Sequence, residues 1–283
     1  MANNLARGAV FLLLGELCLA IMAAMIKHLA EQTSHETIVF ARNLFGFIAV
    51  IPIALRFGIA DLATQVFPMH LLRAVTGLTA MYGYFYVIAN MPLAEAVLVK
   101  LSAPFFLPII AFLWLKEKIN HLTIWSIVIG FVGVIFVLRP GSETFQPVAL
   151  LGIGAAVLAS FAKVCIRRMA STEPSHRIVF YFGLLATLIS AVPAIINWQP
   201  PLSVNTWLWL AGVGIAGTCG QLLMTQAYII AKPGQVGPYT YSSVVYASIM
   251  GWIFWQEILV WTTIIGCSLI IGAGILNMKK ANS

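Results

Sequence analysis

Long runs of apolar residues fill most of the chain, and each ends at a short polar connection or at glycine and proline. Each run has about the 20 residues that an α-helix needs to cross ~30 Å of hydrocarbon. The alternation of apolar and polar residues that marks the strands of a membrane barrel is absent. The pattern therefore predicts an all-α membrane protein with ten transmembrane helices, at residues 8–29, 35–56, 68–90, 93–115, 120–138, 148–168, 175–196, 205–230, 235–256 and 258–278.

Matching landmarks in the two halves of the chain indicate an internal repeat. Glu117 and Glu257 each end an apolar run and are 140 positions apart, and Pro52 and Pro193 are 141 positions apart. The segment from Gly141 to Pro147 resembles a linker and lies near the midpoint of the chain. Each half would contain five helices, and because five is odd the second half is expected to be inverted relative to the first.

The repeat predicts two inverted five-helix domains, at residues 1–141 and 147–283. Inverted repeats are typical of alternating-access transporters, in which the binding site lies near the middle of the membrane between the halves. The alternative is that a duplication built a larger helix bundle without a transport function.

Composition supports a membrane protein, because 61% of the residues are hydrophobic and 9% are charged. About a quarter of the residues of a soluble domain are charged, so this chain has too few charges to cover a water-facing surface. The four cysteines lie singly in apolar runs, without the spacing of a disulfide framework or a metal site. We expect them to be small core residues.

Lysine and arginine residues are distributed unevenly about the predicted spans. If the N-terminus is cytoplasmic, only Lys27 and Arg139 fall on the outer side. This bias predicts a multi-pass membrane protein with both termini in the cytoplasm. The net charge of +7 then reflects topology, and no nucleic-acid partner is expected. The residues assigned to the cytoplasmic side are Arg7, Arg56, Arg73, Lys116, Lys118, Arg167, Arg168, Arg177, Lys232, Lys279 and Lys280.

Four ionisable residues, Glu16, Arg42, Lys100 and Lys163, interrupt the apolar runs. A charge in the hydrocarbon costs at least ~2.5 kcal/mol, so each should be paired or face water. We expect Glu16 to pair with Arg42 or Lys100, either as a structural salt bridge or as part of a binding site. Lys163 lies near the end of its run, where a lysine can extend to the interface. Glu16 is the one carboxylate deep in a predicted span, so it is the candidate for proton coupling.

Polar and aromatic side chains near these charges complete the candidate site. Tyr82, Tyr86 and Asn90 are spaced by four residues, so they share one face of a helix. Aromatic rings with polar tips suit an amphipathic or ring-bearing organic solute. The alternative is packing between helices or a position at the membrane interface. The candidate substrate-binding residues are Glu16, Arg42, Tyr82, Tyr86, Asn90, Lys100, Gln221, Gln226, Tyr239 and Tyr241.

Motifs of enzymes and of ATP-driven pumps are absent from the sequence. It contains no HExxH, no Walker-type GxxxxGK[ST], no nucleophile elbow and no cluster of histidine and cysteine. We therefore expect no enzymatic activity, no metal and no other cofactor, and transport that runs on a gradient or downhill.

Over essentially its whole length the chain resembles the EamA branch of the drug/metabolite transporter superfamily. The resemblance implies ten helices in two EamA repeats and a transport function, and Arg42 matches a common position of the family. The family carries amino acids, nucleotide-like metabolites, vitamins and drugs, and segment 167–182 is similar to members that carry S-adenosylmethionine or riboflavin. The resembling segments are IVFARNLFGFIAVIP (38–52), LRAVTGLTAMYGYFYVIANMPLAEAVLVKLSAPF (72–105), FLWLKEKI (112–119), RRMASTEPSHRIVFYF (167–182), AKPGQVGPYTY (231–241) and GWIFWQE (251–257).

We expect a secondary transporter that moves a small zwitterionic or cationic organic metabolite, such as an amino acid or an S-adenosylmethionine-like molecule, by alternating access. One alternative is an exporter of lipophilic cations, for which Arg42 and Lys100 would be dispensable. An alternative of another class is a membrane scaffold or accessory protein that transports nothing. The bacterial inner membrane and its lipids are the expected surroundings, and the protein is expected to act as a monomer or a homodimer.

Overall fold

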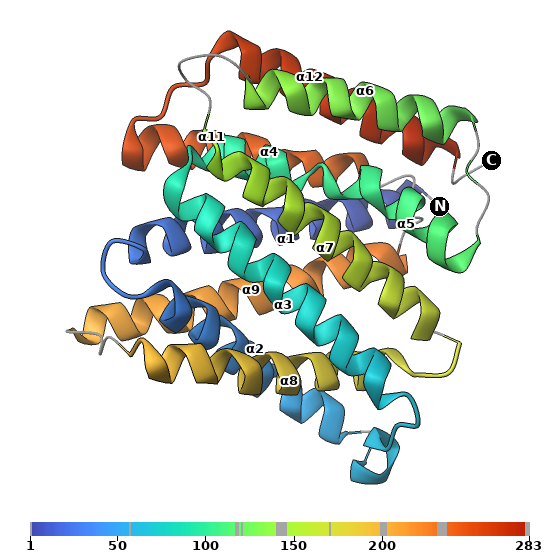
Figure 1. The fold of residues 1–283 in the computed structure, drawn as a ribbon, viewed down its shortest axis with the longest axis vertical. Helices are drawn as coiled ribbons and strands as arrows, with labels where there is room; N and C mark the ends of the chain where they lie inside the picture. The colour runs from blue at the N-terminus through green and yellow to red at the C-terminus, as the bar shows by residue number, and fades with distance from the viewer. Residues whose placement is uncertain are drawn as a thin grey trace.

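The computed structural model describes residues 2–56, 58–116, 119, 121–139, 146–169, 171–198, 203–230 and 237–280. The expectations placed on Glu117, Lys118, Lys232 and residues 141–145 lie outside this part of the chain. Within it the regular secondary structure is entirely helical (Figure 1). The elements are α1 (Ala2–Leu29), α2 (His35–Leu55), η1 (Ile59–Leu62), α3 (Phe67–Asn90), α4 (Leu93–Lys100), α5 (Ala103–Leu115), α6 (His121–Leu138), α7 (Val148–Met169), α8 (Ser175–Ile196), α9 (Val204–Ile230), η2 (Gly237–Tyr241), α11 (Ser242–Trp255) and α12 (Trp261–Lys280).

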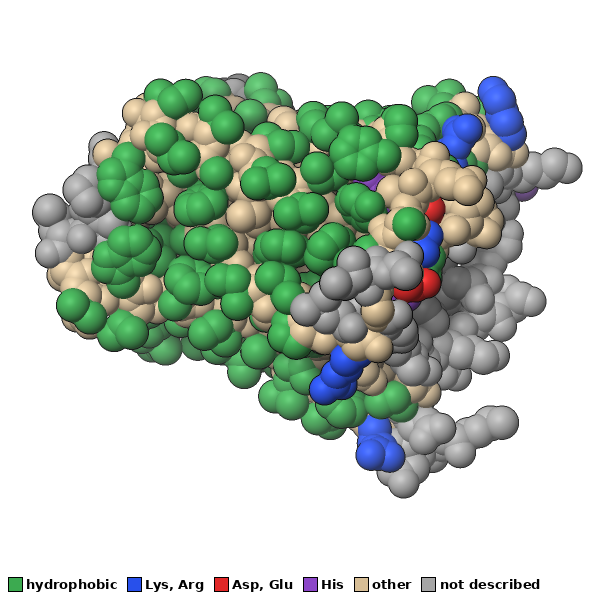
Figure 2. All heavy atoms as spheres, turned by 90° about the horizontal axis from the view of Figure 1, so that it is seen from below, with side chains coloured by type: hydrophobic (Ala, Val, Ile, Leu, Met, Phe, Trp, Pro, Cys, Tyr) green, Lys and Arg blue, Asp and Glu red, His purple; other side chains and the backbone are tan. Residues whose placement is uncertain are grey.

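The helices are long enough and apolar enough to cross a membrane in seven places among the described residues. The expected spans that do not meet this measure coincide with α2, α11 and α12, so the count of ten remains a prediction. Figure 2 shows a broad face covered by hydrophobic side chains, with lysine and arginine gathered at one end. The spans are Leu5–Leu29, Phe67–Asn90, Leu93–Leu115, His121–Leu138, Val148–Met169, His176–Ile196 and Val204–Met224.

The start of α1 and the end of α12 lie at the same end of the bundle (Figure 1). We call this end the N-end, and the opposite end, where α1 stops at Leu29, the far end. The closest packing joins helices from the two halves of the chain: α1 with α9, α3 with α7, α2 with α8, and α6 with α12. In the last pair Gly133 faces Gly266, and a Cβ on Gly133 would lie 2.8 Å from the carbonyl oxygen of Gly266. Glycine is required here because the two backbones touch.

Two of the predicted helices are not continuous α-helices. The expected helix at 93–115 breaks at Leu101 and Ser102, where the Ser102 hydroxyl donates to the Val99 carbonyl oxygen at 2.6 Å. Pro104 follows at the start of α5, where a missing N–H costs nothing. The expected helix at 235–256 is likewise divided into η2 and α11. A break such as that at Leu101 and Ser102 is tolerated within a membrane only inside protein or beside a water-filled space.

α5 and α11, the last parts of these two predicted helices, also end in the same way. Lys116 and Gln256 cap α5 and α11 in the left-handed conformation, with φ of 58° and 54°. Each stands one position before the glutamates on which the repeat was predicted, Glu117 and Glu257. The 140-residue offset is therefore repeated in a backbone feature that neither residue type favours.

Candidate functional site

Glu16 lies near the middle of α1 and is 2% exposed. It is within electrostatic range of Lys100 and Lys163, and it also acts on Tyr84. The predicted ion pair with Arg42 or Lys100 is not formed, and no hydrogen bond reaches Glu16 from any residue that the structure describes. α1 thus places a buried carboxylate opposite two lysines without a direct partner.

Lys100 is the last residue of α4 and stands at the break between α4 and α5. Its Nζ atom lies 5.1 Å from the centre of the Tyr84 ring, a cation–π contact that holds the ammonium group in place. It is also within electrostatic range of Arg42. Lys163 on α7 is exposed although it lies inside a candidate span.

Arg42 on α2 makes one long hydrogen bond, from Nη1 to the Asn43 Oδ1 at 3.3 Å. Its guanidinium lies against α9, where a Cβ on Gly217 would be 3.6 Å from Nε. Arg73 on α3 lies over the Phe182 ring at 3.9 Å, and its Nε and Nη1 are buried without a hydrogen-bond partner among the described residues. The two arginines are close enough to repel each other.

Tyr82 and Tyr86 share a face of α3, as their spacing predicted, but this face points to a groove of about 400 Å³ between α2, α3 and α7. The Nε2 atom of His35 is hydrogen-bonded to the Tyr82 carbonyl oxygen at 3.0 Å, and its ring contacts both tyrosine rings. Asn90 is exposed and donates to the Tyr86 carbonyl oxygen at 2.8 Å. Glu16 does not line this groove. The tyrosine that does face the charges is Tyr84, which sequence spacing did not single out.

The candidates on α9 and η2 are not joined to Glu16 by any hydrogen bond within the described ranges. Gln221 and Gln226 are exposed on α9, and Tyr239 is 40% exposed. Tyr241 is buried, and its hydroxyl occupies the place that a Cβ on Gly274 would take. Tyr241 therefore packs η2 against α12.

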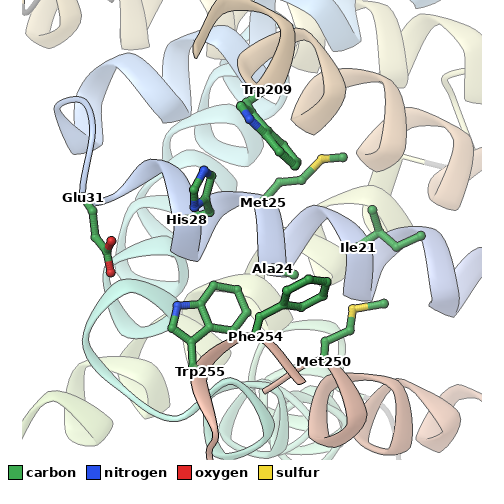
Figure 3. Close-up of a pocket in the computed structure, with 9 residues that line it drawn as sticks. All are labelled: Ile21, Ala24, Met25, His28, Glu31, Trp209, Met250, Phe254 and Trp255. Carbon is green, nitrogen blue, oxygen red and sulfur yellow. The ribbon is translucent and has the colours of Figure 1, made fainter. Parts of the chain in front are cut away.

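A larger cavity of about 710 Å³ lies between α1, α9 and α11 toward the far end (Figure 3). Its walls are mostly apolar, and His28 and Glu31 supply polar groups near the end of α1. Sequence reasoning did not identify this cavity, because its lining is spread over three helices far apart in the chain. The lining residues are Ile21, Ala24, Met25, His28, Glu31, Trp209, Met250, Phe254 and Trp255.

Ion pairs close the far end of the bundle. Lys27 of α1 pairs with Glu257 and also donates to the Met91 carbonyl oxygen at 2.7 Å. The Leu93 N–H, at the start of α4, donates to the other oxygen of Glu257 at 2.7 Å. A carboxylate at a helix N-terminus is favourable because it satisfies free N–H groups and opposes the helix dipole.

A second far-end pair, between Arg139 and Glu95, connects α6 with α4. Thr263 of α12 completes it: Arg139 Nη2 donates to Thr263 Oγ1 at 2.7 Å, and this hydroxyl donates to Glu95 at 2.9 Å. α1, α4, α6 and the segments around α11 and α12 are thereby tied together at one end.

At the N-end, Glu173 joins the start of α8 to α3 and η1. Its carboxylate accepts hydrogen bonds from Thr64 at 3.0 Å and Arg177 at 3.1 Å, and lies 3.4 Å from His70 Nε2. Burial raises the pKa of the Glu173 carboxyl, but these hydrogen bonds outweigh it and hold the pKa below its usual value. Asp61 pairs with His176 and Arg177 beside it.

A family model describes almost the entire chain: the model of the EamA-like transporter family matches residues 6–139 and again residues 146–278. This chain belongs to the EamA-like transporter family. The EamA-like protein is therefore a multi-pass membrane transporter and not an enzyme. The resemblance stated from the sequence is confirmed.

Named relatives of this EamA-like transporter carry different metabolites. The pseudopaline exporter CntI of Pseudomonas aeruginosa is 31% identical over 270 residues, which cover 95% of this chain and 94% of that protein. The S-adenosylmethionine uptake transporter of Rickettsia bellii is 27% identical, with coverage of 92% and 90%. The riboflavin transporter of Vibrio cholerae is 25% identical, with coverage of 87% and 84%.

A solved crystal structure shares the fold of this EamA-like transporter. Its TM-score is 0.64 with 19% sequence identity, and the alignment covers 100% of both chains. At this identity the likeness concerns the fold alone. The relatives show that the EamA-like protein handles a small metabolite, and their differing cargoes and directions leave its own substrate to be inferred from its residues.

Proposed function

We propose that this EamA-like protein is a secondary transporter that moves a small zwitterionic organic metabolite by alternating access. The single observation that carries the proposal is the buried Glu16, which has no ion pair with any described residue and lies within electrostatic range of Lys100 at a helix break. A zwitterion would offer an amino group to the carboxylate and an acidic group to the lysines. A buried charge without a partner destabilises the fold unless a substrate or a proton binds to it.

Two halves, residues 1–141 and 147–283, would rock around this site. The helix pairings support the proposal. An inverted repeat relates α1 to α7 and α3 to α9, so it converts the pair α1–α9 into the pair α7–α3, and both pairs are present. The far-end ion pairs would hold one side closed, and Glu16 would take up or release a proton when the substrate leaves.

We propose the bacterial inner membrane as the location, with the N-end in the cytoplasm. The bias of lysine and arginine and the bacterial relatives support this orientation. A cysteine placed at Gln146, between the predicted halves, should then react with a membrane-impermeant thiol reagent added outside. Labelling only from the cytoplasmic side would overturn the orientation.

The lipophilic-cation exporter is the weaker candidate, because Lys100 and Lys163 oppose a cation beside Glu16. A purified-protein thermal-shift screen against a metabolite library, followed by flux in proteoliposomes, tests both proposals. Stabilisation and flux with amino-acid-like zwitterions support the main one, and flux restricted to lipophilic cations supports the exporter. A protein that moves no solute in liposomes would be a scaffold.

A further inference from the structure

Positive charge exceeds negative charge among the described side chains that lie within electrostatic range of one another around Glu16. Lys100 and the exposed Lys163 lie within electrostatic range of Glu16, Arg42 lies within range of Lys100, and Arg73 lies within range of Arg42. These four cations come from α2, α3, α4 and α7, and one carboxylate stands among them. None of the four has an ion pair with any described residue. Among the described residues, this cluster therefore carries an excess of positive charge.

Arg42 and Arg73 present N–H donors that have no acceptor among the described residues. A guanidinium presents five N–H donors in a planar fork, and the Phe182 ring covers the face of Arg73 but not its edge. Nε and Nη1 of Arg73 are buried and unpartnered, and Arg42 uses one long bond. Buried donors without acceptors are costly, and a carboxylate or phosphate accepts two of them at once.

The lysine side of the cluster is held in place in a different way. Tyr84 fixes the Lys100 ammonium group through its ring, at 5.1 Å, and leaves the N–H donors available. Lys163 approaches the same carboxylate from α7. Two anion-binding positions thus adjoin each other, one built from arginines and one from lysines, with Glu16 on the lysine side.

We propose that the substrate is an acidic metabolite with more anionic groups than amino groups. Arg42 and Arg73 bind one carboxylate or phosphate, Lys100 and Lys163 bind a second, and Glu16 receives the amino group or a proton. The inference rests on the proposed transport function and makes it more specific, because a neutral zwitterion has one anionic group for two anion-binding positions and would leave the excess positive charge unchanged.

A bacterial metabolite extract, separated by ion exchange into net-anionic, neutral and net-cationic fractions, supplies the probes. Thermal stability of the purified protein is measured with each fraction, and counterflow is measured in proteoliposomes loaded with the same fraction. We expect the anionic fraction to stabilise the protein and to exchange. Prior treatment of that fraction with phosphatase abolishes the effect if the recognised group is a phosphate monoester, and leaves it if the group is a carboxylate.

Charge-removing variants assign the effect to the cluster. Arg42→Gln and Arg73→Gln should each raise the concentration of anionic fraction needed for half-maximal stabilisation by about tenfold, whereas Arg7→Gln, exposed near the start of α1, should not change it. Arg42→Lys and Arg73→Lys keep the charge and should recover part of the effect, which separates binding from a failure to fold.

Stabilisation by the neutral or cationic fraction alone would overturn the acidic-substrate inference and leave the transport function standing. Equal affinity of Arg42→Gln, Arg73→Gln and Arg7→Gln for the anionic fraction would also overturn it. Absence of stabilisation and counterflow with every fraction would overturn the transport function itself, and the inference with it.

Discussion

At the far end, Lys27 pairs with Glu257 and Arg139 pairs with Glu95, whereas in the middle of the bundle Glu16 has no ion pair with any described residue. Both regions lie inside the helical bundle and both carry carboxylates and cations. At the far end each carboxylate also receives a further hydrogen bond, from the Leu93 N–H or the Thr263 hydroxyl.

The difference indicates a division of roles. A buried pair with satisfied hydrogen bonds fixes how helices meet, and removing one partner leaves an uncompensated charge. A buried charge without a partner contributes nothing comparable to the fold, so its retention points to a ligand or a proton. From this comparison we expect the far end to close the bundle and the middle to bind the substrate.

The largest expected effect is on transport by Glu16→Gln, which removes the charge and the proton but keeps the size of the side chain. We expect transport against a gradient to be abolished while downhill exchange continues, because exchange needs binding and no net proton movement. Since no ion pair is broken, the free energy of unfolding should change by less than about 1 kcal/mol. Uphill and exchange flux in proteoliposomes and the melting temperature measure the two parts.

A fall in stability of Glu16→Gln that is reversed by a second change, Lys100→Met, would instead make Glu16 a structural partner. Normal uphill flux together with normal stability would leave Glu16 with neither role. Either result would remove the contrast between the middle and the far end.

The next effect concerns the far end, where Glu257→Gln leaves the partly buried Lys27 beside a neutral side chain. Breaking such a pair costs about 3 kcal/mol, so the melting temperature should fall clearly. The double variant Lys27→Met with Glu257→Gln should recover most of the loss. Glu31→Gln is the matched control, because Glu31 is exposed and forms no ion pair with described residues. A single variant as stable as this control would show that the pair does not close the far end.

The sequence alone identified Glu16 and Lys100 in the middle of the bundle as candidate site residues. It did not identify the ion pairs of the far end. Glu16 and Lys100 stand out because charges are rare in apolar runs. Lys27 and Glu257 are 230 residues apart, and no local pattern in the sequence predicts their contact. The lengths of the spans and the helical fold class can be predicted from hydropathy, because hydropathy is a local property of the chain. The positions of isolated charges can be read from the sequence for the same reason.

Two residues of the middle were missed, for physical reasons. The sequence places Arg73 on the cytoplasmic side because it lies near the start of its span, and no local pattern predicts that its guanidinium lies over the Phe182 ring of α8. Tyr84 was passed over because the spacing of Tyr82 and Tyr86 identifies a shared face without saying which face points inward. Side-chain direction depends on how α3 packs against α7, which is tertiary information.

A moderate effect is expected where α6 and α12 support the Arg139 network. A Cβ on Gly133 would lie 2.8 Å from the carbonyl oxygen of Gly266 and 2.9 Å from the Ile270 side chain. Gly133→Ala should therefore separate the helices and destabilise the protein by about 1–3 kcal/mol. Gly272→Ala on α12 meets nothing within 4 Å and should be neutral or slightly stabilising. Equal melting temperatures for the two variants would mean that α6 and α12 adjust at no cost.

The smallest expected effect concerns Glu173 at the N-end, whose pKa is held below its usual value by hydrogen bonds from Thr64, Arg177 and His70 that outweigh the effect of burial. A carboxylate with a lowered pKa stabilises the fold above its unfolded-state pKa of ~4.3, and this contribution is lost as the pH falls through the lower folded-state value. Glu173→Gln should thus lower the melting temperature by a few degrees at neutral pH.

The same variant should also flatten the acid limb of the stability profile, because the group that titrates there is gone. The measurement is the melting temperature of purified protein from about pH 7 down to about pH 3.5, with Glu31→Gln as control. The difference between wild type and Glu173→Gln should be constant at neutral pH and shrink toward zero in acid. A difference that does not depend on pH would assign the loss to side-chain packing and would contradict a charge-dependent connection between α8 and α3. This contribution should remain smaller than that of the far-end pair, because Glu173→Gln keeps an acceptor for Thr64, and the Arg177 that it leaves retains Asp61.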